Sequence, residues 1–282
     1  MLLVASIQAA NYYFYDALLP GIAFLGFLSY SFFDRKHDSQ LAETTQATQK
    51  TRFSLIDFKK LMTNPSFIYV TLLCVTFYSA VFPFQSFSAD FFLNKFSLSQ
   101  QASGRIASYL SLGTMAFTSL FGFVVDKYGR SATLMISGSL LLILIHLTLA
   151  FTLINPVITM IFPGVAFSLM PAAMWPSVAK IVDEKRIGTA FGAVYSLQNR
   201  GLWAFPLMTG IVFDKSNPSI TSEVIATGNY AYDYAWALLK LAGLGILGLI
   251  FSVLLKCEDL KSGSGLELPG NVQKTSWLYG LI

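Results

Sequence analysis

The chain has 282 residues, of which 54% are hydrophobic and only 12% are charged, and its formal net charge at pH 7 is +4. Soluble domains carry about 25% charged residues, so this composition excludes an ordinary soluble globular domain and indicates a membrane protein. The two cysteines, Cys74 and Cys257, exclude a scaffold held together by several disulfides.

Seven segments are apolar and long enough to form transmembrane helices, each of which needs about 20 mostly apolar residues. These segments are residues 17–33, 66–88, 102–125, 132–153, 156–181, 187–213 and 231–256. The apolar stretch at 1–10 is too short to cross a bilayer, and no basic segment precedes it as in a signal peptide. We therefore expect an all-α membrane protein that is a fragment and begins with the end of an earlier helix.

The positive charges indicate which side of the membrane each connection faces. Most of the 19 Lys and Arg residues, such as Lys127 and Lys185, lie in every second connection between spans. The connections on the opposite side of the membrane carry few, one of which is Lys215. Positive residues concentrate on the cytoplasmic side. This pattern predicts a polar cytoplasmic linker at 34–65 and a cytoplasmic tail at 257–282, whose Ser-Gly run favours flexibility.

The turn between the spans at 102–125 and 132–153 carries the most specific motif in the chain. It reads G-F-V-V-D-K-Y-G-R from Gly122 to Arg130. This pattern, G-x-x-x-D-x-x-G-R, resembles the signature loop of the major facilitator superfamily of transporters, although Ser131 replaces the second basic residue that usually follows. The motif predicts both the fold and the side of the membrane on which the turn lies.

The resemblance implies a domain organisation. The superfamily builds twelve helices as two six-helix halves joined by a long cytoplasmic loop. Residues 66–256 would then form the C-terminal six-helix bundle, and residues 1–33 would be a remnant of the N-terminal bundle with one complete span. Because the N-terminal bundle is largely absent, we expect that bundle of the same protein to be a partner, together with the lipid bilayer.

The same resemblance assigns roles to the motif residues. Gly122 permits close helix approach, and Gly129 adopts a turn conformation that a side chain would strain. Asp126 lies against the N-terminus of a helix in the other half, where free N–H groups favour a carboxylate. Arg130 holds Asp126 in place. Together these four residues would form a latch of the outward-open state.

Further strings narrow the resemblance. The residues at 80–84, 94–96 and 174–176 read A-V-F-P-F, N-K-F and M-W-P, and those at 187–192 and 196–199 read I-G-T-A-F-G and S-L-Q-N. This set, in this order, resembles the lysosomal dipeptide transporter subfamily and its bacterial relatives over roughly residues 66–256. Arg200 departs from the subfamily, in which an apolar residue normally follows the polar run.

Two spans carry aromatic residues that we predict to line a substrate cavity. Tyr78, Phe82 and Gln85 follow one another at helical spacing, and Pro83 loosens the helix beside them. Trp175 lies in a span that carries Pro163, Pro171 and Pro176. Interrupted helices of this kind line the binding sites of transporters, but an aromatic stripe equally serves simple packing.

The span at 187–213 contributes the polar cavity candidates, Tyr195, Gln198, Asn199 and Arg200. Polar groups in mid-membrane must face protein or water, because each costs free energy in hydrocarbon. Arg200 lies at the middle of its span and could clamp a substrate carboxylate. At 100° per residue, however, Gln198, Asn199 and Arg200 cannot all face one cavity squarely, and hydrogen bonding between helices is an equally simple role for the amides.

These observations predict a secondary active or facilitative transporter that moves a small polar solute, such as a dipeptide or an amino-acid-like molecule, by alternating access. No Asp or Glu lies in the central part of any span, which favours facilitated transport unless the carboxylate belongs to the other half. A proton-coupled sugar or drug transporter of the same superfamily is the alternative within this class.

Other classes fit less well. A seven-helix receptor or retinal protein would explain Asp126-Lys127-Tyr128 and Lys240, but no carboxylate is placed as a counter-ion. A membrane scaffold without transport activity is a further alternative, since half a transporter cannot enclose a path for a solute. No hydrolase or nucleotide-binding motif occurs, so we expect no enzyme, cofactor, metal site or nucleic-acid partner.

The location follows from the same resemblance. We expect a multi-pass integral membrane protein of a bacterial inner membrane or, alternatively, of the lysosomal membrane. The sequence does not decide whether the protein has an accessory membrane subunit.

Overall fold

The computed structural model describes residues 17–18, 20–34, 55–221, 224 and 232–269. The chain divides into two compact units, residues 1–52 and 53–282. Within the first unit, residues 20–34 are helical and mostly exposed, in agreement with the span expected at 17–33. Residues 1–16 and 19 of the predicted N-terminal remnant and most of the predicted linker at 34–65 lie outside the described residues.

The second unit is built from helices. Every regular element described in it is helical, which confirms the all-α fold. The elements are α2 (Leu55–Met62), α3 (Pro65–Phe96), α4 (Gln100–Tyr128), α5 (Ser131–Phe151), α6 (Pro156–Ile181), a short 3-10 turn η1 (Glu184–Arg186), α7 (Ile187–Ser216) and α9 (Ala235–Ser262).

Among the described residues, five helices are long and apolar enough to cross a membrane: α3, α4, α5, α6 and α9. Helix α7 has 30 residues and covers the span expected at 187–213, but it is not one of those five. Helix α3 extends beyond the expected end at 88 and includes Asn94 and Lys95. The six long helices therefore match the six expected segments in order, with shifted ends.

Local sequence signals explain where two of these helices begin. The Asn64 side chain accepts a hydrogen bond from the Phe67 N–H at the start of α3 (3.4 Å), and the Asn155 side chain accepts one from the Val157 N–H at the start of α6 (2.9 Å). A proline follows each asparagine. Asparagine satisfies a free N–H of the first turn, and proline at the first helical position has no N–H to satisfy.

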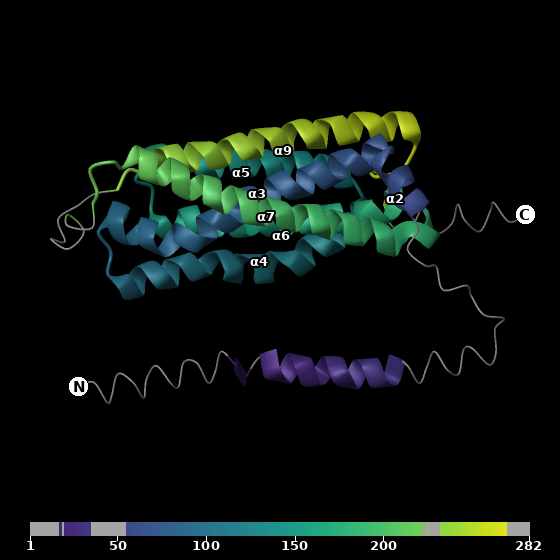
Figure 1. The fold of residues 1–282 in the computed structure, drawn as a ribbon, viewed down its shortest axis with the longest axis horizontal. Coiled ribbons are helices and arrows are strands. Elements are labelled where there is room, and N and C mark those ends of the chain that lie inside the picture. Colours follow the sequence, from purple (N-terminus) through teal and green to yellow (C-terminus); the bar gives the residue numbers. More distant parts are fainter. Residues whose placement is uncertain (1–16, 19, 35–54, 222–223, 225–231, 270–282) are drawn as a thin grey trace, which may run out of the picture. The chain divides into compact units, whose positions relative to one another are not determined.

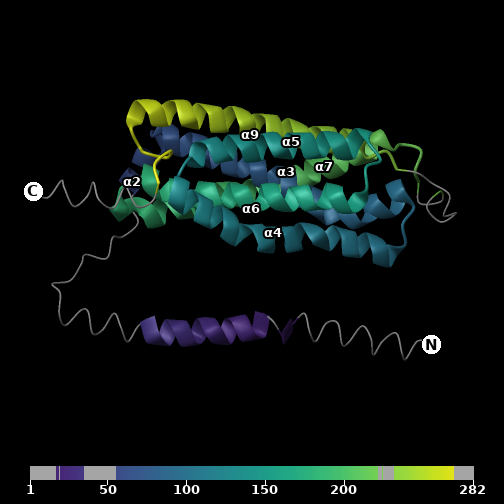
Figure 2. The ribbon, with the colours of Figure 1, turned by 180° about the vertical axis from the view of Figure 1, so that it is seen from behind.

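The long helices pack lengthwise into one bundle (Figures 1 and 2). Helices α5 and α9 lie together on one side, α4 lies on the other side against α6, and α3 and α7 lie between them. Of the most apolar stretch of α3, 72% is buried, compared with 11% for α4. Helix α3 is thus the centre of the bundle, and α4 is its most open member.

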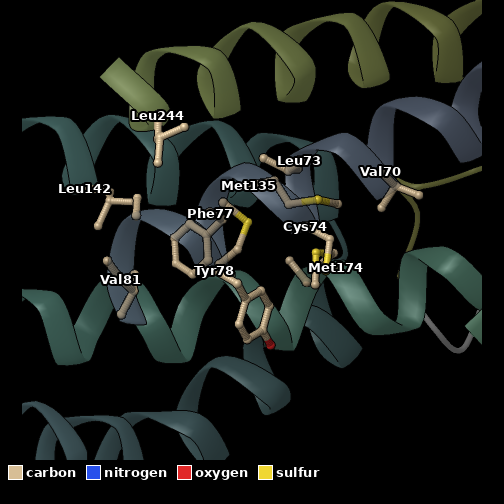
Figure 3. Close-up of a cluster of buried hydrophobic side chains, with 14 of the residues drawn as sticks. Val70, Leu73, Cys74, Phe77, Tyr78, Val81, Met135, Leu142, Met174 and Leu244 are labelled. Atoms are coloured by element: carbon tan, nitrogen blue, oxygen red, sulfur yellow. The ribbon is translucent and has the colours of Figure 1, made fainter. Parts of the chain in front are cut away.

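The core lies where α3 meets α5, α6 and α9. Figure 3 shows side chains from these helices in one cluster, including Phe77, Met135, Leu142 and Leu244. All four are buried. Burial of a large apolar side chain contributes about 1.5–3 kcal/mol, so this cluster provides much of the stabilisation that fixes α3 in the middle of the bundle.

The two ends of the bundle are distinct. At one end of the bundle, the turn between α4 and α5 lies near the end of α6. There Lys180 of α6 donates to the carbonyl of Leu268, which follows α9 (3.0 Å). At the same end, Arg186 forms an ion pair with Asp57 of α2 (2.9 Å). The connection that contains Asn155 lies at the other end, because α5 runs the length of the bundle between the two turns. The motif turn therefore lies opposite that connection, as the charge pattern predicts.

The expected flexible tail is wrong over residues 257–269. Helix α9 continues to Ser262 and ends at Gly263, whose φ of 67° is left-handed and whose N–H donates to the Asp259 carbonyl. Residues 263–269 then return over the end of the bundle, where the backbone of Leu266 accepts a hydrogen bond from Ser131. The glycines act as turn residues here. Residues 270–282 lie outside the described residues.

Candidate functional site

Aromatic side chains from three helices gather at one place on the bundle. Tyr78 stacks on Phe82 within α3 (ring centroids 5.8 Å apart), and Trp175 of α6 stacks on Tyr195 of α7 (4.6 Å). The indole N–H of Trp175 donates to the Tyr78 hydroxyl (3.3 Å), which joins the two pairs. We call Tyr78, Phe82, Trp175 and Tyr195 the aromatic cluster. Helices α3, α6 and α7 thus meet at residues that were predicted from separate segments.

The cluster lies at the boundary between the core and the surface. Figure 3 shows the Tyr78 ring next to Phe77 and Cys74, with its hydroxyl oxygen pointing away from Leu244 of α9. Tyr78 is buried, whereas Phe82 is partly open and Tyr195 is 48% exposed. The cluster therefore presents the rings of Phe82 and Tyr195 at the surface, above a base formed by the buried Tyr78.

Gln198 lies on the face of α7 that packs against α3. It is 7% exposed, and its Oε1 atom is 3.6 Å from the thiol of Cys74. One turn along, a Cβ on Gly201 would lie 2.8 Å from both the Ser79 hydroxyl oxygen and a methyl group of Val75, so the helices approach closely there. Gln198 therefore helps to join α7 to α3, beside the aromatic cluster.

The other polar candidates on α7 face outward. Tyr195, Ser196, Asn199, Arg200 and Trp203 are all exposed, and their spacing places them on one continuous side, which we call the open face of α7. The Asn199 amide donates to the Tyr195 carbonyl within the helix (2.8 Å). Gln198 thus lies on a different face of α7 from Asn199 and Arg200, as the 100° rotation per residue requires.

Gln85 is the predicted residue that the structure does not connect with the others. It lies one turn beyond Phe82 on α3 and is half-buried, and its carbonyl accepts a hydrogen bond from the Ser88 hydroxyl (2.9 Å). Among the contacts of the described residues, none joins it to the aromatic cluster. It stays a candidate by position only.

Sequence reasoning missed two aromatic residues of this region. Phe167 of α6 packs edge-on against Tyr78 (5.7 Å) and Phe82 (5.6 Å), and Phe191 of α7 stacks on Trp175 (5.7 Å). Phe191 lies one turn before Tyr195, so helical spacing from a predicted residue could have identified it. Phe167 has no such signal, because only the packing of α6 on α3 brings it near Tyr78.

The motif turn differs from its expected arrangement. Among the described residues, both ion pairs belong to Arg186, so the expected pairing of Arg130 with Asp126 is not formed. The physical reason is that α4 ends at Tyr128. Asp126 lies in its last turn and Arg130 lies beyond it, so the two do not share a helical surface. Lys180 interacts electrostatically with Asp126 as well as with Asp259.

The two motif glycines play different parts. Gly129 is buried at φ 68° and ψ −127°, a conformation that a side chain would strain. Gly122 has open space where a Cβ would be. Nothing in the described bundle approaches Gly122 closely, so its expected role in close helix contact stays a prediction about another surface.

Two cavities lie away from the aromatic cluster. One, of about 240 Å³, lies between α5 and α6 and is lined mostly by apolar side chains such as Leu141 and Phe162. The other, of about 220 Å³, lies between α3, α7 and α9 and includes Asp90 and Tyr234. None of the eight predicted cavity residues lines either of them.

The second cavity contains a hydrogen-bonded carboxylate. The Tyr234 hydroxyl, just before α9, donates to an Asp90 carboxylate oxygen (2.5 Å). Burial, and after it this hydrogen bond, raises the pKa of Tyr234. Asp90 is near the end of α3, which agrees with the expectation that acidic residues avoid the central parts of the spans. In the described residues no cluster of three or more His, Cys, Asp or Glu side chains could hold a metal ion.

Comparison with known proteins gives a family. The model of the family described as Major Facilitator Superfamily matches residues 2–206 and 85–276. These matches include the motif turn, the aromatic cluster and the open face of α7.

The chain is also similar to curated proteins named lysosomal dipeptide transporter MFSD1. It is 34% identical to the Gallus gallus protein over 184 residues, which cover 65% of this chain and 41% of the relative. The Homo sapiens protein is 37% identical over 145 residues, covering 51% and 31%. The Danio rerio protein is 33% identical over 190 residues, covering 67% and 40%. The aligned part of the chain thus spans less than half the length of these relatives.

Proposed function

The chain belongs to the major facilitator superfamily, and from this premise we propose that it supplies the C-terminal bundle of a transporter for a small polar solute, a dipeptide or an amino-acid-like molecule. It is a multi-pass integral membrane protein. In the proposed organisation residues 66–256 form the bundle, 34–65 the linker, 1–33 part of the N-terminal bundle, and 257–282 a cytoplasmic segment.

The aromatic cluster beside the open face of α7 is the observation that carries the proposal. Trp175 and Tyr195 present a stacked pair of rings, and Asn199 and Arg200 lie on the same helix as Tyr195. Aromatic rings, an amide and a guanidinium suit a dipeptide, which offers a flat peptide group and a carboxylate. Ring faces also attract ammonium groups.

Arg200 is the proposed partner of the solute carboxylate. Its guanidinium can form two parallel hydrogen bonds to a carboxylate, which is a strong and directional pairing. The side chain is exposed, and among the described residues it has no ion-pair partner. An arginine at mid-helix costs about 3 kcal/mol in hydrocarbon, so a water-filled solute path is the environment that suits it.

Alternating access needs a second surface. Helix α4 and the open face of α7 are the least enclosed parts of the bundle, and we propose that they face the N-terminal bundle of the same protein across the solute path. Asp126, exposed at the end of α4, would then meet a helix N-terminus of that bundle as a latch.

The remaining parts of the proposal follow from the same comparison. The relatives are named for the lysosome, so a lysosomal membrane is one proposed location and a bacterial inner membrane the other. We propose a transporter without enzymatic activity. Because acidic residues of the described spans lie toward their ends, we propose facilitated transport through this half.

The test is uptake of labelled dipeptides by the full-length protein in liposomes. We expect substitution of Gln198, Asn199 and Arg200 by Ala to reduce uptake, because two of these side chains face the path and the third positions α7. Trp236→Ala is the control: this side chain is also highly exposed, but it lies on α9. Uptake that is unchanged in the triple variant would remove the site, and lack of uptake of any peptide would remove the substrate class.

A further inference from the structure

Residues 263–269 follow α9 and lie across the turn between α4 and α5. We call them the C-terminal strap. The Arg130 N–H donates to the Glu267 carbonyl (3.1 Å), and the Ser131 N–H donates to the Leu266 carbonyl (3.0 Å). Two successive backbone groups of the motif turn are thus bound by two successive residues of the strap, which fixes their relative position.

The strap also caps α5. Arg130 occupies the cap position of this helix, and its side chain makes no capping hydrogen bond. The Glu267 carboxylate takes that place: it accepts hydrogen bonds from the Thr133 N–H and from the Thr133 hydroxyl (both 2.9 Å). Lys256 of α9 donates to the same hydroxyl (2.7 Å). A carboxylate at a helix N-terminus binds free N–H groups and is favoured by the helix dipole.

The strap is anchored on the bundle at other points. Leu266 is fully buried (0% exposed), and its N–H donates to the Asp259 carboxylate of α9 (3.0 Å). Lys180 of α6 donates to the carbonyl of Leu268 (3.0 Å). The Leu268 side chain, in contrast, is 47% exposed. The strap is therefore held by one buried side chain, by the carboxylates of Glu267 and Asp259, and by its own backbone.

The motif glycine and the strap are in direct contact. A Cβ on Gly129 would lie 2.5 Å from the carbonyl carbon of Leu268 and 2.6 Å from the Glu267 carbonyl oxygen. Real Cβ atoms do not approach backbone this closely. Gly129 therefore does more than permit a turn: its missing side chain is the space in which the strap lies.

We propose that the C-terminal strap is a positioning element for the latch, with Glu267 as its main positioning residue. It fixes the turn that follows Asp126 and caps the helix after it, so that Asp126 is presented in one orientation to the other bundle. Release of the strap weakens the latch and shifts the transporter from the outward-open toward the inward-open state. This inference rests on the proposed function, since a latch acts only in a transporter.

The experiment compares three variants of the full-length protein. Leu266→Ala removes the buried anchor, Glu267→Gln removes the charge of the cap, and Leu268→Ala, a leucine of the same strap with an exposed side chain, is the matched control. Hydrogen exchange at residues 129–133 reports whether the strap is bound. A Ser196→Cys reporter on the open face of α7, in a Cys257→Ser background, is labelled from the cytoplasmic side of oriented membrane vesicles with an impermeant reagent.

We expect exchange at 129–133 to rise roughly tenfold or more in Leu266→Ala and Glu267→Gln, because each loses a buried or charge-assisted contact. Labelling of the reporter should rise in the same two variants, and Leu268→Ala should match the wild type in both. Exchange at wild-type rates in Glu267→Gln would show that the strap does not hold the turn. Faster exchange with unchanged labelling would show that it does not govern the latch. The exchange result stands even if the protein transports no peptide, so the two failures are distinguishable.

Discussion

Trp175 and Tyr78, which are 97 residues apart in the chain, are joined by a hydrogen bond from the indole N–H to the hydroxyl oxygen (3.3 Å). Trp175 also stacks on both Phe191 and Tyr195 of α7. A single indole therefore connects α3, α6 and α7 at the proposed solute site. If α6 moves relative to α3, the hydrogen bond must break or the two side chains must move together.

Tyr78→Phe is predicted to lower dipeptide uptake at low substrate concentration by about three- to tenfold, because a neutral hydrogen bond contributes about 0.5–1.5 kcal/mol. The ring and its stacking on Phe82 remain, so the free energy of unfolding should fall by no more than about the same 0.5–1.5 kcal/mol. Tyr69→Phe, in the same helix but outside the aromatic cluster, is the control. The measurement is initial uptake rate against dipeptide concentration in liposomes, and equal rates in both variants would contradict a role for this bond.

The spacing of residues within one helix was sufficient for part of this site. Tyr78 and Phe82 are four residues apart and do stack, because such neighbours share one side of a helix. The meeting of Trp175 with Tyr78 could not be predicted in this way, since it depends on how α6 packs on α3. Both residues were candidates, but their contact is a property of the fold.

Arg200 can be tested through the chemistry of the solute. We predict that the wild type transports a dipeptide with a free C-terminal carboxylate at least tenfold better than the same dipeptide with a C-terminal amide, because a charge-assisted hydrogen bond contributes about 1.5–3 kcal/mol. Arg200→Ala should lose this preference by slowing the carboxylate form alone. Arg200→Lys should retain only part of it, because an ammonium lacks the planar fork.

The decisive quantity is the ratio of the two uptake rates in each variant. A change that merely destabilised the protein would lower both rates together and leave the ratio intact. If Arg200→Ala keeps the wild-type preference for the free carboxylate, another group binds the carboxylate.

Gly201 is predicted to be the least replaceable glycine of α7. Gly201→Ala should destabilise the bundle by about 1–3 kcal/mol, because the added Cβ would overlap the Ser79 hydroxyl oxygen and a Val75 methyl group at 2.8 Å. Gly210→Ala, in the same helix, meets no atom within 4 Å. It should stabilise by about 0.5–1 kcal/mol through helix propensity.

Thermal unfolding of the purified variants checks this pair. The two substitutions are chemically identical and lie in one helix, so a difference between them isolates the contact with α3. Equal melting temperatures would indicate that α7 does not pack on α3 as closely as described.

The end of the chain shows where composition misleads. A Ser-Gly run is typical of flexible segments, yet Gly263 and Gly265 have positive φ and reverse the chain so that it can lie on the motif turn. Composition does not distinguish glycine that allows motion from glycine that fits a required turn. The capping of α5 by Glu267 at Thr133 could not be predicted from the sequence either, because the two residues are 134 positions apart. In contrast, the six long helices could be located from apolar length, whereas the short α2 (Leu55–Met62) lies inside the predicted linker.

Gly129→Ala is predicted to be the most damaging single change in the motif turn. The backbone conformation alone costs a residue with a side chain about 1–3 kcal/mol, and the new Cβ would also collide with the backbone of Glu267 and Leu268. The turn can relieve the collision only by releasing the strap, so hydrogen exchange at residues 130–133 should accelerate and the melting temperature should fall.

Gly122→Ala provides the comparison, because it lies in α4 with open space at its Cβ. That variant should keep slow exchange and melt at or slightly above the wild-type temperature, while its uptake falls if the other bundle packs on Gly122. Slow exchange in Gly129→Ala would mean that the strap does not need the space that this glycine leaves.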